Sequence, residues 1–316
     1  MMSLVRRAAR RARRVPRGLV LRAARAGIRV LSGPDEARPP MIEDLHLVLS
    51  PNRVGSNTLW NVLRQLPVEG AFHKAHSVCG PELPGWEECP FPKWELVRMN
   101  ESDGKTWERV LLHRRLMARA AVAGGRPPRK IRVMSAVREP VAQWISALFY
   151  SAQRYPEVLD PASLTVEKVT RYLTGELHIV YPWLEGGEWW EHDAWIHREL
   201  GDRMGFSVFR TPFDRERGWQ VYEGRDARLL IIRQESMGRI QEAVGEFYGL
   251  PAASVPTVRE NDSGSFPYHE QYLGVRGKIR LPEPLLDRIY STELVRHFYT
   301  PAEIAGFKAR WSGRSA

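Results

Sequence analysis

The chain has 316 residues, 43% of them hydrophobic, which is enough to bury one large core or two modest ones. No apolar run approaches eighteen residues, so we expect no membrane-spanning helix. The two cysteines, Cys79 and Cys89, are too few for a disulfide framework and indicate a reducing compartment.

The net charge of +10 belongs to an N-terminal leader. Residues 1–34 contain ten arginines, no lysine and no acid, whereas the rest of the chain carries 37 basic and 37 acidic residues. Such a leader suits an anionic membrane surface or a nucleic acid, or it is a solvated tail. Because nucleic-acid-binding domains usually have a basic face, the neutral body argues against a nucleic-acid partner. We expect a leader over 1–40, a globular domain over 41–316, and a cytoplasmic protein whose leader can contact the inner face of the membrane.

Hydrophobic patterning predicts strands that alternate with helices along the globular part. Short apolar runs predict strands at 46–49, 71–77, 131–137 and 228–233. Helical spacing and end signals predict helices that start near residue 59 and cover 105–122, 140–153, 236–249 and 301–311, with an aromatic-rich helical segment at 165–203. Residues 80–104 read as a long loop or lid. This alternation predicts an α/β fold with a parallel sheet flanked by helices.

The turn between the first strand and its helix suits a phosphate. Gly55 lets the backbone approach a ligand, nearby hydroxyls donate hydrogen bonds, and the new helix presents free N–H groups. Arg53 adds a forked set of charged donors. The alternative is an ordinary strand–loop–helix connection capped by Ser56. It is not a Walker A loop, because no Gly-x-x-x-x-Gly-Lys-Ser/Thr sequence occurs.

Two further polar clusters follow predicted strands. One is His73–Ser77, and the other begins at Arg138, with Ser146 two helical turns later. Ligands of parallel sheets gather beyond the carboxyl ends of the strands, where this arginine and serine could hold one phosphate from two sides. Helix capping or an ion pair with Glu139 or Glu157 is the alternative role for the arginine.

Together these motifs resemble those of sulfotransferases that use 3′-phosphoadenosine 5′-phosphosulfate (PAPS). Pro51-Asn52-Arg53-Val54-Gly55-Ser56-Asn57-Thr58 is similar to their 5′-phosphosulfate loop, Lys74-Ala75-His76 to the end of their second strand, and Arg138-Glu139-Pro140 with Ser146 and Phe149 to their 3′-phosphate motif. Leu229–Glu235 and His297–Ile304 are similar to segments of a bacterial branch of capsular polysaccharide synthesis proteins.

The resemblance implies a single P-loop-like α/β domain that transfers a sulfuryl group from PAPS to a hydroxyl or amine of a carbohydrate or small molecule. His76 would be the general base and Lys74 would neutralise developing charge. The 5′-phosphosulfate would be held by Arg53, Gly55, Ser56, Asn57 and Thr58. Arg138 and Ser146 would hold the 3′-phosphate, and the scheme requires no metal.

The sequence departs from the family pattern at three places. Asn52 adds a residue between Pro51 and Arg53, and Asn57 stands where a second hydroxyl residue is usual. The C-terminal Arg-Lys-Gly element is not found, and Arg259 or Lys278 are the basic residues that could replace it.

Other functions compete with this hypothesis. His73, His76, Cys79 and Cys89 are four potential zinc ligands, although their spacing matches no common site. A magnesium-dependent nucleotide kinase or hydrolase would need an acid at a strand end, which Arg233-Gln234 does not provide. A non-catalytic binding protein of polysaccharide biosynthesis is a third alternative.

Four tryptophans are concentrated in one segment, at positions 183, 189, 190 and 195. Aromatic side chains stack on sugar rings, so this segment could cover the acceptor, but helical packing is the commoner reason for such residues.

Overall fold

In a computed structural model of the chain, we describe residues 44–51, 53–75, 131–154, 159–176, 193–224, 227–258 and 267–313. The leader, the lid at 80–104 and the helix predicted at 105–122 lie outside these residues. So do His76, both cysteines and Arg259, along with Trp183, Trp189 and Trp190 of the tryptophan segment.

The fold is built on a five-stranded sheet in the order β2-β1-β3-β5-β4. The strands are β1 (Leu45–Leu49), β2 (Ala71–Ala75), β3 (Ile131–Val137), β4 (Trp219–Glu223) and β5 (Ala227–Arg233). The first four in that order run parallel, and β4 is antiparallel to β5. The predicted α/β class and the four predicted strands are therefore confirmed, although the structure describes the second strand only as far as Ala75.

The edge strand β4 was not predicted. Its sequence, Trp-Gln-Val-Tyr-Glu, lies in a polar, charged stretch and gives no continuous apolar run. The strand is formed by pairing with β5, from Trp219 opposite Ile232 to Glu223 opposite Arg228. Pairing with β5 therefore supplies the backbone hydrogen bonds of a strand that its residue pattern does not predict.

The sheet buries both of its faces, because alternate residues of each strand enter different hydrophobic clusters. Leu47, Val133 and Leu229 lie side by side in the sheet register and belong to the larger cluster. Their successors Val48, Met134 and Leu230 are equally aligned and belong to the smaller one. Burial on both faces explains the near-continuous apolar runs that make these strands recognisable in the sequence.

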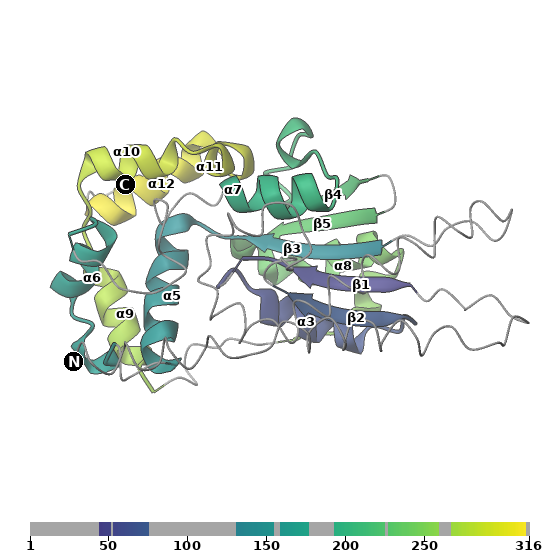
Figure 1. The fold of residues 1–316 in the computed structure, drawn as a ribbon, viewed down its shortest axis with the longest axis horizontal. Helices are drawn as coiled ribbons and strands as arrows, with labels where there is room; N and C mark the ends of the chain where they lie inside the picture. Colours follow the sequence, from purple (N-terminus) through teal and green to yellow (C-terminus); the bar gives the residue numbers. More distant parts are fainter. Residues whose placement is uncertain are drawn as a thin grey trace, which may run out of the picture. The chain divides into compact units, whose positions relative to one another are not determined.

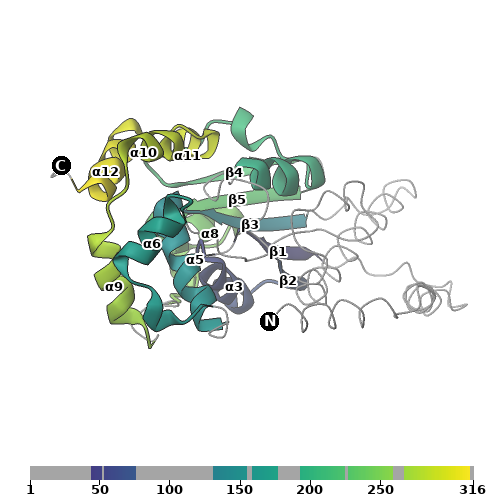
Figure 2. The same cartoon turned by 60° about the vertical axis from the view of Figure 1, so that its left-hand side comes forward.

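The helices divide between the two faces of the sheet. Side chains of α3 (Ser56–Gln65) and α8 (Ile240–Tyr248) enter the smaller cluster. The larger cluster takes side chains from α5 (Pro140–Arg154), α6 (Val166–Leu173), α9 (His269–Lys278), α10 (Glu283–Tyr290), α11 (Glu293–Phe298) and α12 (Pro301–Ser312). Figures 1 and 2 show α5, α6 and α9 grouped together, with α10, α11 and α12 forming a second group.

The helix predictions at 140–153 and 301–311 are confirmed by α5 and α12. The helix predicted at 236–249 begins as a 3-10 turn, η7 (Gln234–Arg239), before α8. In the segment 165–203, α6 is followed after the undescribed residues by a short α7 (Asp193–Trp195) and a π-helix, η5 (Ile196–Arg203). Shorter 3-10 turns are η3 (Pro161–Ser163), η6 (Val208–Arg210) and η8 (Ala252–Ser254).

Helices α9, α10 and α11 were not predicted. Gly274 and Gly277 weaken the helical signal of α9, and α11 is only six residues long. These helices are stabilised by packing: Tyr272, Leu286 and Val295, one from each, are buried in the larger cluster.

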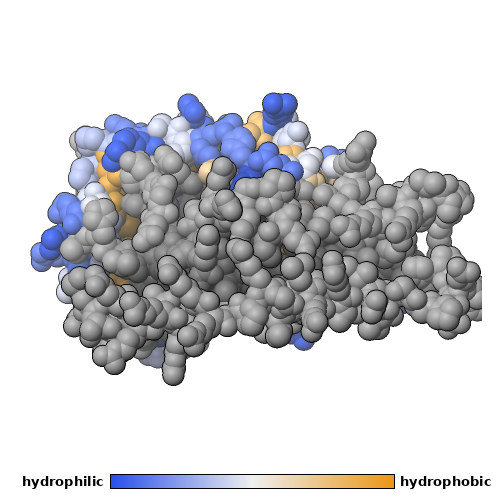
Figure 3. All heavy atoms as spheres, in the orientation of Figure 1, coloured by the Kyte–Doolittle hydropathy of each residue, from blue (hydrophilic) through white to orange (hydrophobic). Residues whose placement is uncertain are grey.

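Of the large hydrophobic side chains in the described residues, Leu273 is the one that is exposed. On the face drawn in Figure 3, hydrophilic side chains separate small hydrophobic areas. None of the helices in the described ranges has the length and apolar character needed to cross a membrane.

Candidate functional site

The candidate site lies where β1 and β3 end. From β1 the chain passes to β2 on one side, and β3 and β5 lie on the other. Where successive connections leave a strand toward opposite sides, open α/β sheets bind ligands beyond the carboxyl ends of the strands. The loop containing Arg53 follows β1, and Arg138 follows β3.

The β1–α3 loop turns through two left-handed residues. Arg53 has φ 64°, and Gly55, the N-cap of α3, has φ 99°. A Cβ added at Gly55 would lie 2.9 Å from Cε of Met237 in η7, a methyl group that can move aside, so it is the left-handed conformation that favours glycine here. The helix has no side-chain cap, which contradicts the alternative that Ser56 caps it. The first turn of any α-helix carries backbone N–H groups with no acceptor inside the helix, which is why helix N-termini suit anions.

Three of the predicted phosphate-binding residues are in direct contact. Nε of Arg53 donates to Oγ of Ser146 at 3.2 Å, and Nη1 of Arg138 donates to the carbonyl oxygen of Arg53 at 3.0 Å. These residues come from the loop after β1, from the end of β3 and from α5. Two cationic side chains and a hydroxyl thus come together beyond the ends of β1 and β3.

The Arg53 guanidinium lies among tyrosines. It stacks over the ring of Tyr150 at 4.6 Å, and Tyr268 and Tyr272 of the α9 region also act on it. Burial lowers the pKa of Arg53, and the positive charge of Arg138 adds to this effect. An anion placed between the two arginines would relieve their repulsion.

A second contact joins the end of β2 to the start of α3. Nζ of Lys74 hydrogen-bonds to Oδ1 of Asn57. Ser56 and Thr58 are buried in the first turn of the same helix. The predicted phosphosulfate loop and the predicted lysine are therefore neighbours, whereas His76 lies outside the described residues and its role stays a prediction.

Behind Arg138, a network of buried carboxylates ties the sheet to the C-terminal helices. Glu139 accepts hydrogen bonds from the backbone N–H groups of Val141 and Ala142, both at 2.8 Å, and from the hydroxyl of Tyr290 at 2.5 Å. It is fully buried, and this burial raises its pKa despite the three donors. Glu139 thus caps α5 and is not an ion-pair partner of Arg138 in the described contacts.

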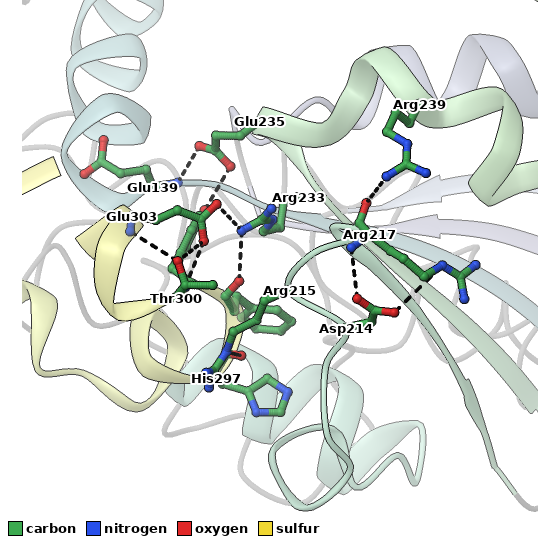
Figure 4. Close-up of polar contacts among 12 residues, drawn as sticks. Glu139, Asp214, Arg215, Arg217, Arg233, Glu235, Arg239, His297, Thr300 and Glu303 are labelled. Carbon is green, nitrogen blue, oxygen red and sulfur yellow. Dashed lines mark hydrogen bonds and ion pairs between the residues drawn. The ribbon is translucent and has the colours of Figure 1, made fainter. Parts of the chain in front are cut away.

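Glu235 extends this network to β5. It accepts from the backbone N–H of Glu139 at 3.0 Å and from the hydroxyl of Tyr299 at 3.0 Å. Nearby, Arg233 donates to Glu303 at 2.6 Å. Figure 4 shows Glu235 reaching the backbone of Glu139, with Arg233 directed toward Glu303. The strand ends on which the candidate site rests are thereby fixed to α10 and α12.

Several of these residues were missed by sequence reasoning. Tyr150 lies four residues after Ser146 on α5, and Tyr268 and Tyr272 are again four apart, so each pair shares a helix face. The four-residue spacing from Ser146 to Tyr150 can be seen in the sequence once Ser146 is taken as a candidate phosphate ligand. The partnership of Glu139 with Tyr290 leaves no sequence signal, because 151 residues separate them.

Within the ranges that the structure describes, no group of three or more His, Cys, Asp or Glu side chains could hold a metal ion. The zinc alternative depends on His76, Cys79 and Cys89, which lie outside those ranges, so it is not tested here.

Comparison with known families gives one partial match. The family model NKWYS, described as "Putative capsular polysaccharide synthesis protein", matches residues 189–300. The matched region spans β4, β5 and the helices up to α11, but not the loop after β1 or the Arg138–Ser146 motif. No curated protein and no solved structure matches the chain significantly. The likeness to capsular polysaccharide synthesis proteins expected from Leu229–Glu235 is thus supported.

Proposed function

We propose that this protein is a PAPS-dependent sulfotransferase that modifies a carbohydrate acceptor in capsular polysaccharide synthesis. The observation that carries the proposal is the contact of Arg53 with Arg138 and Ser146 beyond the ends of β1 and β3. Residues separated by 85 and 93 positions meet there, and their charge and donors suit the binding of an anion. The partial family match supports the biosynthetic context, and a small-molecule acceptor would use the same donor site.

The proposed reaction transfers a sulfuryl group in line. A bond forms between an acceptor oxygen and the sulfur, and the bond from sulfur to the bridging oxygen of the phosphosulfate breaks. The acceptor proton passes to His76, and adenosine 3′,5′-bisphosphate leaves. Lys74, held beside α3 through Asn57, stabilises the charge that develops on the leaving phosphate.

The contacts at the strand ends favour this reaction over a magnesium-dependent kinase or hydrolase. The carboxylates that follow β3 and β5 belong to Glu139 and Glu235, and both accept hydrogen bonds from the fold itself. A residue that caps a helix or anchors a tyrosine is a poor candidate for a metal ligand. As part of the same proposal, we take the domain to be P-loop-like.

The 3′-phosphate gives the sharpest test. Adenosine 3′,5′-bisphosphate should bind without magnesium and roughly a hundredfold more tightly than AMP, because each hydrogen bond to a charged group contributes about 1.5–3 kcal/mol. Arg138→Ala should reduce that preference and leave the AMP affinity nearly unchanged. Calorimetric titrations of both nucleotides, with and without magnesium, measure these values.

Arg138 also holds the backbone of Arg53, so the melting temperature of the variant is measured as a control for folding. Equal affinities for the two nucleotides in the wild-type protein would refute the proposal. Binding that requires magnesium would instead support the kinase or hydrolase.

A further inference from the structure

The family resemblance assigns Arg53 to the 5′-phosphosulfate. The Arg53 side chain, however, extends toward α5, which carries Ser146. Its Nε donates to Ser146, and its guanidinium lies over Tyr150, so both contacts are with α5. Ser146 is the residue expected at the 3′-phosphate. The arginine therefore lies on the 3′ side of the candidate site.

The backbone explains this direction. Arg53 adopts φ 64°, which is uncommon for a residue other than glycine, and its carbonyl oxygen is held by Arg138. Asn52, the extra residue relative to the family loop, immediately precedes it. The hydrogen bond from Arg138 holds the backbone of Arg53 in this conformation.

The chemistry around Arg53 suits a phosphate monoester. Among the described residues its Nη atoms make no hydrogen bond, and the Nε of Arg138 is buried without a partner. Ser146 accepts from Arg53, so its own hydroxyl proton remains to be donated. The neighbours that act on the pKa of Arg53 are three tyrosines and Arg138, none of which is a carboxylate. Unused donors and unneutralised positive charge together favour an anion at this point.

The 5′ side has its own cation. Lys74 contacts Asn57 at the start of α3, beside the loop that turns at Gly55. The helix N-terminus and Lys74 can serve the phosphosulfate without Arg53.

Given the proposed function, we infer that Arg53 is a specificity residue for the 3′-phosphate, which it binds together with Ser146 and Arg138. It supplies the second basic group that the missing Arg-Lys-Gly element would otherwise provide. Arg259 and Lys278 were the two residues considered for that role. Arg259 lies outside the described residues, and Lys278 lies at the end of α9, six positions beyond Tyr272.

The test compares three nucleotides on the full-length protein by calorimetry. The affinity of adenosine 3′,5′-bisphosphate relative to 5′-AMP reports the 3′-phosphate, and its affinity relative to 3′-AMP reports the 5′-phosphate. Arg53→Gln should reduce the first ratio about 10- to 100-fold and leave the second nearly unchanged. Lys74→Met is the matched control and should reduce the second ratio while sparing the first.

Two more variants sharpen the result. If the residues act on one phosphate, adding Ser146→Ala to Arg53→Gln should reduce the first ratio by less than Ser146→Ala does alone. Arg53→Lys keeps the charge but not the forked donors, and it replaces Arg53→Gln if that variant melts early.

The possible outcomes separate the two proposals. If the Arg53 variants lowered the second ratio and left the first unchanged, Arg53 would be a residue of the 5′-phosphosulfate site. That result would overturn this inference. A wild-type protein that does not distinguish adenosine 3′,5′-bisphosphate from 5′-AMP would refute the proposed function itself.

Discussion

Glu139 shows how one buried carboxylate can fix the geometry of the candidate site. It directly follows Arg138 and uses both oxygens to cap α5, the helix that carries Ser146. Tyr290 supplies a third donor from α10. The positions of the two predicted 3′-phosphate ligands therefore depend on a residue that need not touch the nucleotide.

Tyr290→Phe should destabilise the protein in a pH-dependent way. The lost hydrogen bond favours the ionised form of Glu139, so its removal costs about 1.5–3 kcal/mol of unfolding free energy when Glu139 is charged and less when it is protonated. Burial raises the pKa of Glu139 above its ordinary 4.5, so the native state holds this proton to higher pH than the unfolded state does. The stability contributed by Glu139 thus decreases as pH rises from about 4.5 toward the raised value, and the variant extends that decrease.

Urea unfolding of the wild type and the variant at a series of pH values from pH 5 upward measures this effect, and the difference should grow as Glu139 ionises. Tyr222→Phe is the control, because the Tyr222 hydroxyl faces His297, not a carboxylate, at 3.4 Å. Burial lowers the pKa of His297 to about 4, so its charge in the folded state does not change between these pH values. A loss for Tyr290→Phe that stays constant over the whole pH series would contradict the assigned role of Glu139.

At the scale of elements, the alternation of side chains along β2 bears on which histidine, His73 or His76, is the better candidate for the general base. Successive side chains of a strand point to opposite faces. Ala71 packs with the larger cluster and Phe72 with the smaller one, while Lys74 reaches α3. His73 therefore lies on the face of Ala71, opposite the face from which Lys74 reaches the candidate site.

His73→Ala should accordingly leave sulfuryl transfer nearly intact. His76→Ala, which removes the base predicted from the Lys74-Ala75-His76 motif, should reduce turnover by about 10²–10⁴-fold and spare nucleotide binding. Transfer of labelled sulfate from PAPS to a panel of glycans and metabolites measures both variants. A reversal of the two effects would show that the motif was aligned incorrectly, and loss of bound zinc from both would favour the metal alternative.

At the scale of the whole molecule, charge separates the leader from the body. All of the net positive charge precedes Asp35 in the sequence, and every core residue of the described structure follows Asp44. The leader is therefore expected to determine location, not chemistry.

Deleting residues 1–40 should leave the melting temperature and nucleotide affinity unchanged and weaken adsorption to anionic liposomes, because each basic residue near such a surface contributes about 1 kcal/mol. Co-sedimentation with anionic and with neutral vesicles, at low and high salt, measures the effect. A large fall in melting temperature would show that the leader is part of the folded domain.

The sequence alone determined the class of fold and the positions of its central elements. β1, β3 and β5 are apolar runs because they are buried on both faces, and Pro140 marks the start of α5 because proline suits the first turn of a helix. The turn at Gly55 was recognisable because few other residues allow its conformation. These signals are local, so they can be read from the sequence without knowing which elements pack against them.

Only the tertiary structure decided which distant residues meet. It paired β4 with β5, placed Tyr290 on Glu139, and directed Arg53 toward Ser146, which lies 93 positions away. It also showed that Gly55, not Ser56, occupies the N-cap position of α3. Each of these depends on packing and on hydrogen bonds between separate elements, and such contacts leave no periodic trace in the sequence because they form only when the sheet and its helices are assembled.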